Sequence, residues 1–194
     1  MPSMHSRQAR SGVTLIELMI TLTIAAVLLA LAVPQMREYI ARKRVSGAAT
    51  ELASDIRLAR SMVQQQNQPI WITFGSTADF TCYVLYTEGD GSEDCDCART
   101  STPMCGVSPD PPVPLRSVFI KRASGVALTS GARYLRYTQA VGAPRAMSGT
   151  AEAEIIGDIN GNRLGGRVKL IMSGLTRATI CSLAGHTAEF GDCP

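Results

Sequence analysis

The chain has 194 residues, of which 45% are hydrophobic and 18% charged, and its formal net charge is +3 at pH 7. This composition excludes an extensively disordered chain and a membrane protein with many spans, and the small charge does not by itself indicate an acidic partner. Only two histidines are present, which argues against a histidine-dependent hydrolase or a multi-histidine metal centre.

One uninterrupted apolar segment, from Val13 to Val33, accounts for the high mean hydropathy of +0.09. As a helix it would span about 31 Å, close to the hydrocarbon thickness of a bilayer. Its one charged residue is Glu17, which is costly in lipid. The segment is too long for a secretory signal, which has a shorter apolar core before its cleavage site. A plain single-pass anchor fits the length but gives Glu17 no role.

The residues from Gly12 to Leu18 read GVTLIEL and follow a short basic leader. This stretch resembles the class III signal of type IV pilins and type II secretion pseudopilins, whose pattern is GFTLIEL. The resemblance implies cleavage between Gly12 and Val13 by a prepilin peptidase on the cytoplasmic side, followed by N-methylation of the new terminus. The apolar helix is then retained. Val13 departs from the usual phenylalanine, but it is also bulky and apolar, so we expect processing.

The same resemblance gives Glu17 a role in assembly. After cleavage, Val13 would carry a cationic amine at the membrane boundary. In a filament, the amine of a neighbouring subunit would lie beside the Glu17 carboxylate. Such a pair offsets two desolvation costs and sets the axial register of the subunits. The alternative is a carboxylate that is merely tolerated near the membrane interface.

Helical periodicity continues beyond the apolar run. Pro34 follows it, and because proline bends a helix we expect a kink or local melting there, as in pilins. Apolar residues then recur at three- and four-residue steps from Val45 to Val63, with charged residues such as Asp55 largely on other faces. The sequence predicts one long, interrupted helix over 14–66, its first half in lipid and filament core and its second half against a head domain.

After Pro69 the pattern changes to that of short strands. We expect strands at 70–74, 80–87, 117–121, 133–138, 153–156, 167–172 and 177–183, and a tight turn at Asn160-Gly161. The predicted fold is α+β and pilin-like: one long N-terminal α-helix, transmembrane in its first half, packed on a C-terminal antiparallel β-sheet or sandwich head. The predicted parts are a cleaved leader (1–12), a transmembrane helix (13–33), an amphipathic helix (34–68) and a disulfide-stabilised head (69–194).

The six cysteines all lie in the C-terminal two thirds of the chain: Cys82, Cys95, Cys97, Cys105, Cys181 and Cys193. Their even number indicates disulfides and an oxidising compartment, which places the head outside the cytoplasm. Free thiols or a zinc site are the alternatives, and the C-x-C spacing disfavours zinc. The long irregular segment between Glu88 and Pro114 needs disulfides to be ordered. We expect Cys181 to pair with Cys193, and the other four to pair among themselves.

The second half of the head, from Gly149 to Cys181, resembles the minor pseudopilins of the GspH/FimT type. They share a succession of a small-residue turn, a strand, an Asp/Gly turn, a strand and a glycine–arginine hairpin. In some FimT-type members this hairpin reads G-R-x-R and binds DNA during natural transformation. Here it reads GLTR at 174–177, so Arg177 matches the second arginine and Leu175 replaces the first.

DNA binding is therefore an alternative function, with four candidate residues: Arg177, Lys169, Arg167 and Arg163. Basic residues outnumber acidic ones from Arg116 to Arg177, whereas acidic residues dominate from Asp79 to Asp110. This uneven charge would suit phosphate contact or subunit docking. The alternative interpretation is a set of solvated strand faces.

Other kinds of site find little support. Asp158, Asn160 and Asn162 have the spacing of a calcium loop, but Arg163 stands where glycine is expected, which favours a plain turn. Five acidic residues could gather a cation, although an acidic loop is more often solvated: Glu88, Asp90, Glu93, Asp94 and Asp96. His186 alone would remain after cleavage, and no nucleophile motif or phosphate-binding loop is present. We expect no enzyme, no metal and no cofactor.

Together these features predict a minor type IV pilin or type II secretion pseudopilin of the GspH/FimT type. After processing by the prepilin peptidase, it would sit in the inner membrane with its head in the periplasm. It would assemble with other pilins or pseudopilins into a pilus, a pseudopilus or its tip. A DNA-binding receptor for uptake is the alternative, and a single-pass periplasmic anchor domain that never assembles is a third.

Overall fold

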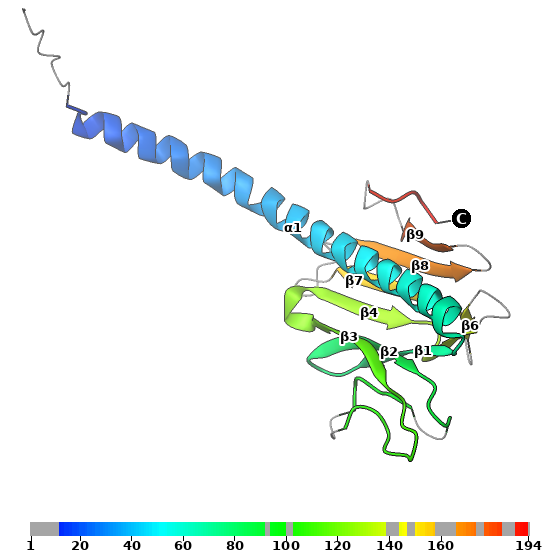
Figure 1. Ribbon diagram of the computed structural model, residues 1–194. Coiled ribbons are helices and arrows are strands. Elements are labelled where there is room, and N and C mark those ends of the chain that lie inside the picture. Colours follow the sequence, from blue (N-terminus) through cyan, green and yellow to red (C-terminus); the bar gives the residue numbers. More distant parts are fainter. Residues whose placement is uncertain are drawn as a thin grey trace, which may run out of the picture. The chain divides into compact units, whose positions relative to one another are not determined.

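The computed structural model describes residues 12–91, 94–99, 103–138, 144–146, 150–157, 166–173, 177–183 and 189–193 (Figure 1). They form one long helix, a short 3-10 helix and two antiparallel β-sheets, which confirms the α+β, pilin-like fold. The chain divides into two compact units, Met1–Arg37 and Glu38–Pro194. The second unit holds the second half of the long helix and the strands, and is called the head below.

The long helix α1 (Leu15–Gln66) begins and ends at capping residues. Thr14 precedes it, and its Oγ1 accepts a 3.3 Å hydrogen bond from the Glu17 backbone N–H. Asn67 follows it with a left-handed φ of 53°, a common way for a helix to end. α1 passes through Pro34 without a break, so the local melting that we expected there does not occur. Proline removes one hydrogen bond and leaves the rest of the ladder intact; a kink at Pro34 stays a prediction.

Within the head, one face of α1 is buried at the spacing that the sequence predicted. Val45, Leu52, Ile56 and Val63 are each 5% exposed or less, and they follow one another at three- to four-residue steps with the alanines between them. They share a single hydrophobic core with side chains from both sheets. The second half of α1 is therefore an integral part of the head.

All neighbouring strands pair antiparallel. The five-stranded sheet has the order β3-β2-β1-β5-β6 and consists of β1 (Ile70–Ser76), β2 (Phe80–Thr87), β3 (Pro114–Lys121), β5 (Tyr134–Tyr137) and β6 (Pro144–Ala146). The four-stranded sheet has the order β4-β7-β8-β9 and consists of β4 (Val126–Ser130), β7 (Glu152–Gly157), β8 (Arg167–Ser173) and β9 (Arg177–Leu183). The 3-10 helix η1 (Arg122–Ser124) joins β3 to β4. In Figure 1 the second half of α1 runs along the sheets.

Two strands, β4 and β6, were missed from the sequence. β4 buries Val126 and Leu128 and leaves the residues between and after them more exposed, which is a strand-like alternation in a short segment flanked by glycines. β6 has three residues and begins with Pro144, which normally argues against a strand. It lies at a sheet edge, where proline is tolerated. The tight turn expected at Asn160-Gly161 lies outside the described residues.

Strand β2 is buried on both faces, which reveals a further layer. Tyr83 and Leu85 belong to the core that α1 covers. Cys82, Val84 and Tyr86 point to the opposite face, where they pack with the three cysteines of the loop between β2 and β3. That loop, residues 88–113, is called the disulfide loop below. It covers the face of the five-stranded sheet that α1 does not.

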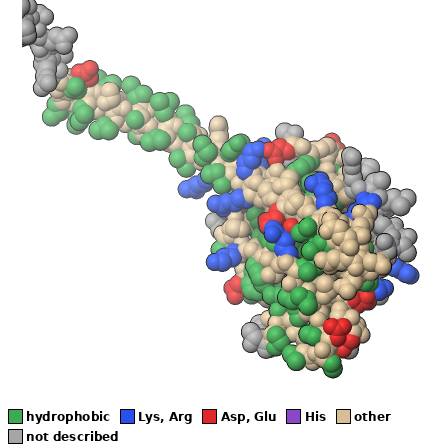
Figure 2. Space-filling view, in the orientation of Figure 1, with side chains coloured by type: hydrophobic (Ala, Val, Ile, Leu, Met, Phe, Trp, Pro, Cys, Tyr) green, Lys and Arg blue, Asp and Glu red, His purple; other side chains and the backbone are tan. Residues whose placement is uncertain are grey.

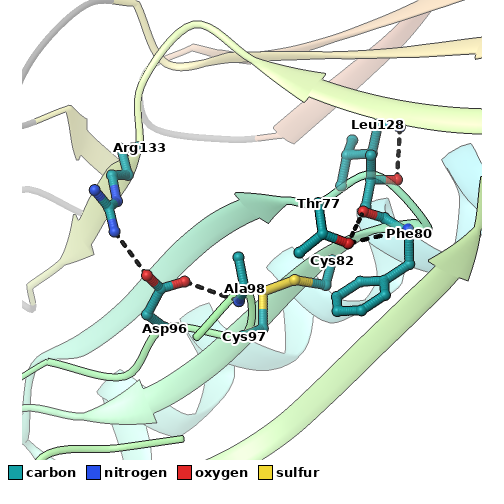
Figure 3. The surroundings of a disulfide bond; sticks show 9 residues. Thr77, Phe80, Cys82, Asp96, Cys97, Ala98, Leu128 and Arg133 are labelled. Carbon is teal, nitrogen blue, oxygen red and sulfur yellow. Dashed lines mark hydrogen bonds and ion pairs between the residues drawn. A yellow bond between two sulfur atoms is a disulfide. The ribbon is translucent and has the colours of Figure 1, made fainter. Parts of the chain in front are cut away.

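Three disulfides hold the head together, namely Cys82–Cys97, Cys95–Cys105 and Cys181–Cys193. The first ties the disulfide loop to β2 (Figure 3), and the second closes the loop on itself. The third joins β9 to the C-terminal segment 189–193. This pattern confirms the expected pairing of Cys181 with Cys193 and of the other four among themselves.

Candidate functional site

The segment before α1 is where the expected processing would act. Gly12 and Val13 lie in non-helical backbone, directly before the capping residue Thr14. Val13 is 71% exposed, and the space around the Cα of Gly12 is open. The bond between them thus lies outside the hydrogen-bonded helix, in exposed backbone that is accessible to a peptidase.

Glu17 stands in the first turn of α1 and has a local role that was missed from the sequence. Thr14 and Glu17 have the T-x-x-E spacing of a capping box, and a negative charge in this turn suits the helix dipole. The T-x-x-E spacing was the sequence signal that could have revealed this role in helix capping. Among the described residues no basic side chain pairs with the Glu17 carboxylate. The carboxylate is therefore open to a cation from outside the chain.

The first half of α1 exposes apolar side chains on every side. Leu15, Leu22 and Leu29 are 76%, 61% and 63% exposed. An 18-residue window of this helix has a mean hydropathy of 2.5 with none of it buried, and among the described residues α1 is the helix long and apolar enough to cross a membrane. Figure 2 shows hydrophobic side chains over the visible surface of this half. Such a surface needs lipid or other apolar helices around it.

A buried carboxylate fixes the second half of α1 on the five-stranded sheet. Asp55 is 4% exposed, and its Oδ2 accepts hydrogen bonds from the Tyr83 hydroxyl at 2.7 Å and from Arg116 Nε at 2.6 Å. Arg116 also binds Glu51 at 2.9 Å, one turn earlier on α1. Burial, together with the bond to Asp55, raises the pKa of Tyr83 well above its usual range. The network joins the helix to β2 and β3.

Placing Asp55 largely on a face other than the apolar stripe of the helix was wrong. It follows Leu52 by three residues and precedes Ala59 by four, so it lies within the apolar stripe. The phase of the stripe was the signal that could have located it. Its burial is possible because Arg116 and Tyr83 supply the donors that a buried carboxylate requires.

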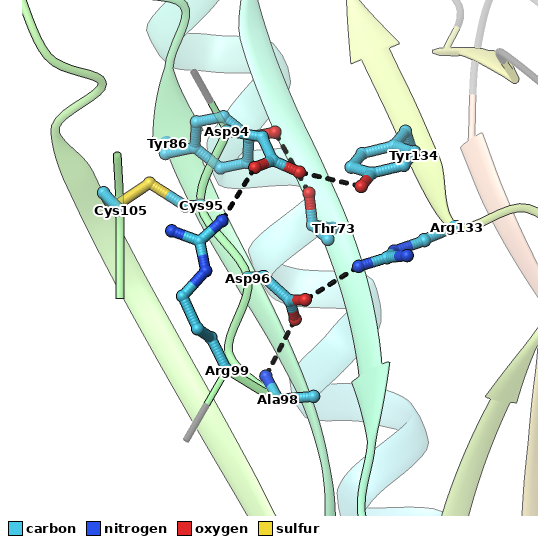
Figure 4. A network of polar contacts seen from close by, with 10 residues as sticks. All are labelled: Thr73, Tyr86, Asp94, Cys95, Asp96, Ala98, Arg99, Cys105, Arg133 and Tyr134. Atoms are coloured by element: carbon cyan, nitrogen blue, oxygen red, sulfur yellow. Dashed lines mark hydrogen bonds and ion pairs between the residues drawn. A yellow bond between two sulfur atoms is a disulfide. The ribbon is translucent and has the colours of Figure 1, made fainter. Parts of the chain in front are cut away.

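The acidic disulfide loop binds the beginning of β5, at Tyr134 and at Arg133 directly before it (Figure 4). Arg133 contacts Asp96 at 2.7 Å, and the Tyr134 hydroxyl donates to Asp94 at 2.7 Å. Burial and the bond to Asp94 raise the pKa of Tyr134 to about 12. The opposite charges noticed in the sequence thus meet within the head and hold the loop on the sheet.

A further contact of the same kind joins Arg136 to Glu88 at 2.8 Å, with the Arg136 guanidinium 5.4 Å from the centre of the Trp71 ring. Three of the loop carboxylates considered for a cation, Glu88, Asp94 and Asp96, are therefore bound to basic or hydroxyl partners. In the described part of the chain, no group of three His, Cys, Asp or Glu side chains is arranged to hold a metal ion. Glu93, His186 and the residues from Asp158 to Arg163 lie outside it.

The structure brings together two of the four residues expected to contact DNA. Arg167 and Lys169 point to the same side of β8, while Val168 and Leu170 between and beyond them are buried. Each already has a carboxylate on the neighbouring strand β7: Arg167 binds Glu154, and Lys169 binds Glu152 at 2.7 Å. Arg177 begins β9, and Arg163 lies outside the described residues.

Two family models match the chain. The prokaryotic N-terminal methylation motif matches residues 7–33, which contain Gly12, Val13 and Glu17. The model of the type II transport protein GspH matches residues 48–174, from the second half of α1 to just beyond β8. The two matches divide the chain much as its two compact units do.

Similarity to individual proteins points in the same direction. Two curated proteins of Pseudomonas aeruginosa, each named a fimbrial protein, are 41% identical to the chain over 89 residues, which is 44% of this chain and 56% of each relative. The chain therefore spans about half the length of the curated relatives it matches. No solved structure matches the chain.

Proposed function

The chain belongs to the family of the type II transport protein GspH, and from this premise we propose that it is a minor subunit of a type IV pilus or of a type II secretion pseudopilus. With its methylation motif and apolar helix, it is a membrane-anchored, type IV pilin-like structural protein. Its families consist of filament subunits rather than enzymes, so its work is assembly.

Maturation at Gly12 and Val13 is the first step of the proposal. A prepilin peptidase on the cytoplasmic face of the inner membrane would remove residues 1–12, and the new terminus at Val13 would be N-methylated. The exposed, non-helical backbone at this bond supports that step. Residues 13–33 would stay in the membrane, and residues 34–68 would lead to the strands of the head.

Residues 69–194, the part of the head that follows α1, would lie in the periplasm. Its three disulfides support this location, because disulfides form and persist in oxidising compartments. Such a head is separated from the cytoplasmic leader by a helix long enough to span a bilayer. The mature subunit would then be anchored by α1 until neighbouring subunits draw it into a filament.

The observation that carries the proposal is a carboxylate in an apolar helix that has no cationic partner within the described chain. A lone Glu17 is costly in lipid, and the cost disappears if a cation lies beside it. The methylated amine at Val13 of a neighbouring subunit is such a cation. Since the amine and the carboxylate are only four residues apart in each subunit, their pairing between subunits also sets the axial register.

Glu17→Ala tests this proposal in the producing cell. We expect the variant to be processed and inserted normally but to be missing from sheared filaments, as measured by immunoblots of membrane and filament fractions. Glu38→Ala is the matched control, because it removes another carboxylate of α1 whose partner, Arg42, lies on the same helix. Entry of Glu17→Ala into filaments at the wild-type level would contradict the proposal.

We place the subunit near the filament tip, as its resemblance to minor pseudopilins implies. Immunogold labelling of the head on isolated filaments measures this position directly. We expect gold particles at filament ends. A regular distribution along the shaft would show that the subunit is not confined to the tip.

DNA binding during natural transformation is the second candidate function. The neighbouring cations Arg167 and Lys169 on β8 favour it, and their existing partners Glu154 and Glu152 weigh against it. The test is a fluorescence-anisotropy titration of the oxidised, detergent-solubilised chain with double-stranded DNA at several salt concentrations. Binding that weakens steeply with salt and falls in Arg177→Ala would support it. An absence of binding at low salt would leave assembly as the function.

A further inference from the structure

The edges of the two sheets are protected to very different degrees. β6 has only three residues. β9 is covered by the C-terminal segment, where Ser182 N–H donates to the Gly191 carbonyl at 2.8 Å and Cys193 N–H donates to the Ser182 carbonyl at 3.1 Å. β4 faces β2, and Leu128 N–H donates to the Thr81 hydroxyl at 3.0 Å. Short or covered edges of this kind prevent unwanted strand pairing.

β3 is the exception. It has eight residues and lies at the edge of the five-stranded sheet, with β2 on one side. On its other side it forms no backbone ladder with any described strand. An edge of this length presents a row of unpaired N–H and C=O groups, which is a template for another strand.

The side chains around this edge are apolar and exposed. Phe119 of β3 is 47% exposed and contacts Phe80 edge to face, with 5.4 Å between the ring centres. Val113, directly before β3, is 54% exposed, and Val107 of the disulfide loop is 78% exposed. These residues would lose unfavourable contact with water if another chain covered them.

A groove adjoins the beginning of β3. Its volume is about 530 Å³, and its walls come from the disulfide loop on one side and from the first residues of β3 on the other. The apolar residues in these walls include Met104, Val107, Pro112 and Leu115. The Cys95–Cys105 disulfide closes the loop next to the groove, so this wall is built into the covalent structure. A side chain from an added strand would find an apolar recess there.

The charge of this edge indicates the chemistry of its partner. β3 and η1 contain Arg116, Lys121 and Arg122 and no acidic residue. Arg116 is held by Asp55, and Arg122 by the Thr77 carbonyl and the Ser76 hydroxyl. Lys121 has no ionic partner among the described residues. A carboxylate on the partner strand would complement it, whereas a second copy of β3 running antiparallel would set basic residues against each other.

We propose that the free edge of β3 accepts an extended strand from a different pilin-like subunit of the same filament. The strand adds to the five-stranded sheet through backbone hydrogen bonds, places an apolar side chain in the groove and sets a carboxylate opposite Lys121. The proposal rests on the filament function proposed above, because that function supplies the partner. It assigns the head an interface separate from the helix contacts of α1.

Photo-cross-linking in the producing cell tests the interface with the full chain. p-Benzoylphenylalanine replaces Phe119 at the free edge or, as the matched control, Thr179 on the exposed face of the covered strand β9. We expect an adduct from position 119 at least about tenfold more abundant than from position 179, mapped by peptide mass spectrometry to a strand of another pilin-like subunit. Adducts to a second copy of this chain, to another segment of the same chain, or at equal yield from both positions would overturn the proposal.

Filament fractions from the same cells test the filament function separately from the β3 interface. A chain that enters filaments but gives no pilin adduct at position 119 would overturn the β3 interface and leave the filament function standing. A chain that never enters filaments would overturn both.

Charge reversal at Lys121 tests the expected carboxylate on the partner strand. Lys121→Glu should lower incorporation into filaments by about tenfold, because it sets two negative charges against each other at the β3 interface. Lys121→Arg and the opposite-edge control Arg145→Glu should leave incorporation at the wild-type level. Equal incorporation of all three variants would contradict the charge complementarity.

Discussion

The first half of α1 presents large apolar side chains on every side, whereas the second half presents them on one. Leu22 and Leu29 are 61% and 63% exposed, and Leu52 and Val63 are 1% and 3% exposed. The sheets of the head supply apolar surroundings for the second half, but lipid or other subunits must supply them for the first. One continuous helix thus stabilises the head with its second half, and we propose that its first half serves assembly.

Each half also contains a carboxylate among apolar residues. Asp55 receives hydrogen bonds from Tyr83 and Arg116 within the chain, while Glu17 has no ionic partner in the described residues. Because a carboxylate removed from water needs compensating donors, the two residues differ in where those donors come from. Asp55 shows how the second half of α1 is fixed to the sheets, and Glu17 is where we propose that another subunit docks.

The largest expected effect comes from Gly12→Val, which tests whether the first half depends on processing. We expect maturation to be blocked completely, because the resemblance to pilins places the cleaved bond directly after Gly12. The intact mass of the membrane-bound chain would then include the leader. Gly47→Ala is the control, since both glycines have open space around them and neither change disturbs packing. Finding the cleaved mass in Gly12→Val would remove the peptidase from the proposed pathway.

Leucine truncations in the two halves compare their contributions to the head directly. Leu52→Ala should lower the free energy of unfolding by about 2–5 kcal/mol, because it leaves a cavity in the shared core. Leu22→Ala, at a position 61% exposed, should leave head stability unchanged. The fluorescence of Trp71, the only tryptophan, reports unfolding of the detergent-solubilised chain in denaturant. A comparable loss in both variants would mean that the halves are not energetically separate.

The sequence located the regular features of the molecule well. The apolar run, the three- to four-residue spacing from Val45 to Val63 and the stop at Pro69 each follow from local chemistry, and the helix has those limits. The six cysteines indicated disulfides, and their clustering in the chain favoured the Cys181–Cys193 pair and pairing of the other four among themselves, without choosing between the possible pairs of those four. Each of these signals lies within a short stretch of sequence, so these features can be predicted without knowing which distant residues meet in the fold.

The features that depend on distant contacts were missed. The burial of Asp55 requires Arg116, which is 61 residues away in the chain. Likewise, the excess of basic residues from Arg116 to Arg177 suited phosphate contact or subunit docking, but one of them, Arg133, binds Asp96, 37 residues away. Charge counts along a sequence cannot show which opposite charges meet in space. The free edge of β3 is a property of sheet order, which no single strand reveals.

Asp55→Ala sharpens the comparison of the two carboxylates. It should lower the free energy of unfolding by about 1–3 kcal/mol, because the buried Tyr83 hydroxyl loses its partner. Glu51→Ala, the control, removes only the exposed contact to Arg116 and should cost between about 0 and 1 kcal/mol. Glu17→Ala should not change head stability at all. The measurement is again unfolding followed by Trp71 fluorescence, and equal losses for Asp55→Ala and Glu51→Ala would show that burial of Asp55 is not the cause.

The smallest expected effect concerns the C-terminal segment, which binds the second half of α1 through Glu189. Lys43 and Ser46 both donate to its carboxylate, and the bond to Lys43 is the main reason that the pKa of Glu189 is lowered. A lowered pKa in the folded state means that the contact stabilises the head above the ordinary pKa of glutamate and is lost as the pH falls through the lowered value. Glu189→Gln should therefore unfold slightly more easily than the wild type at neutral pH and equally easily in acid.

This difference between Glu189→Gln and the wild type should also shrink with added salt, because the ion pair is exposed. Glu38→Gln is the matched control, since its partner Arg42 lies on α1 itself and the change leaves the C-terminal segment in place. The measurement is the unfolding midpoint of the wild type, Glu189→Gln and Glu38→Gln across a range of pH. A Glu189→Gln difference that persists at low pH would show that the ion pair is not its cause. An absence of any difference at neutral pH would show that the segment is held by the Cys181–Cys193 disulfide and its backbone bonds alone.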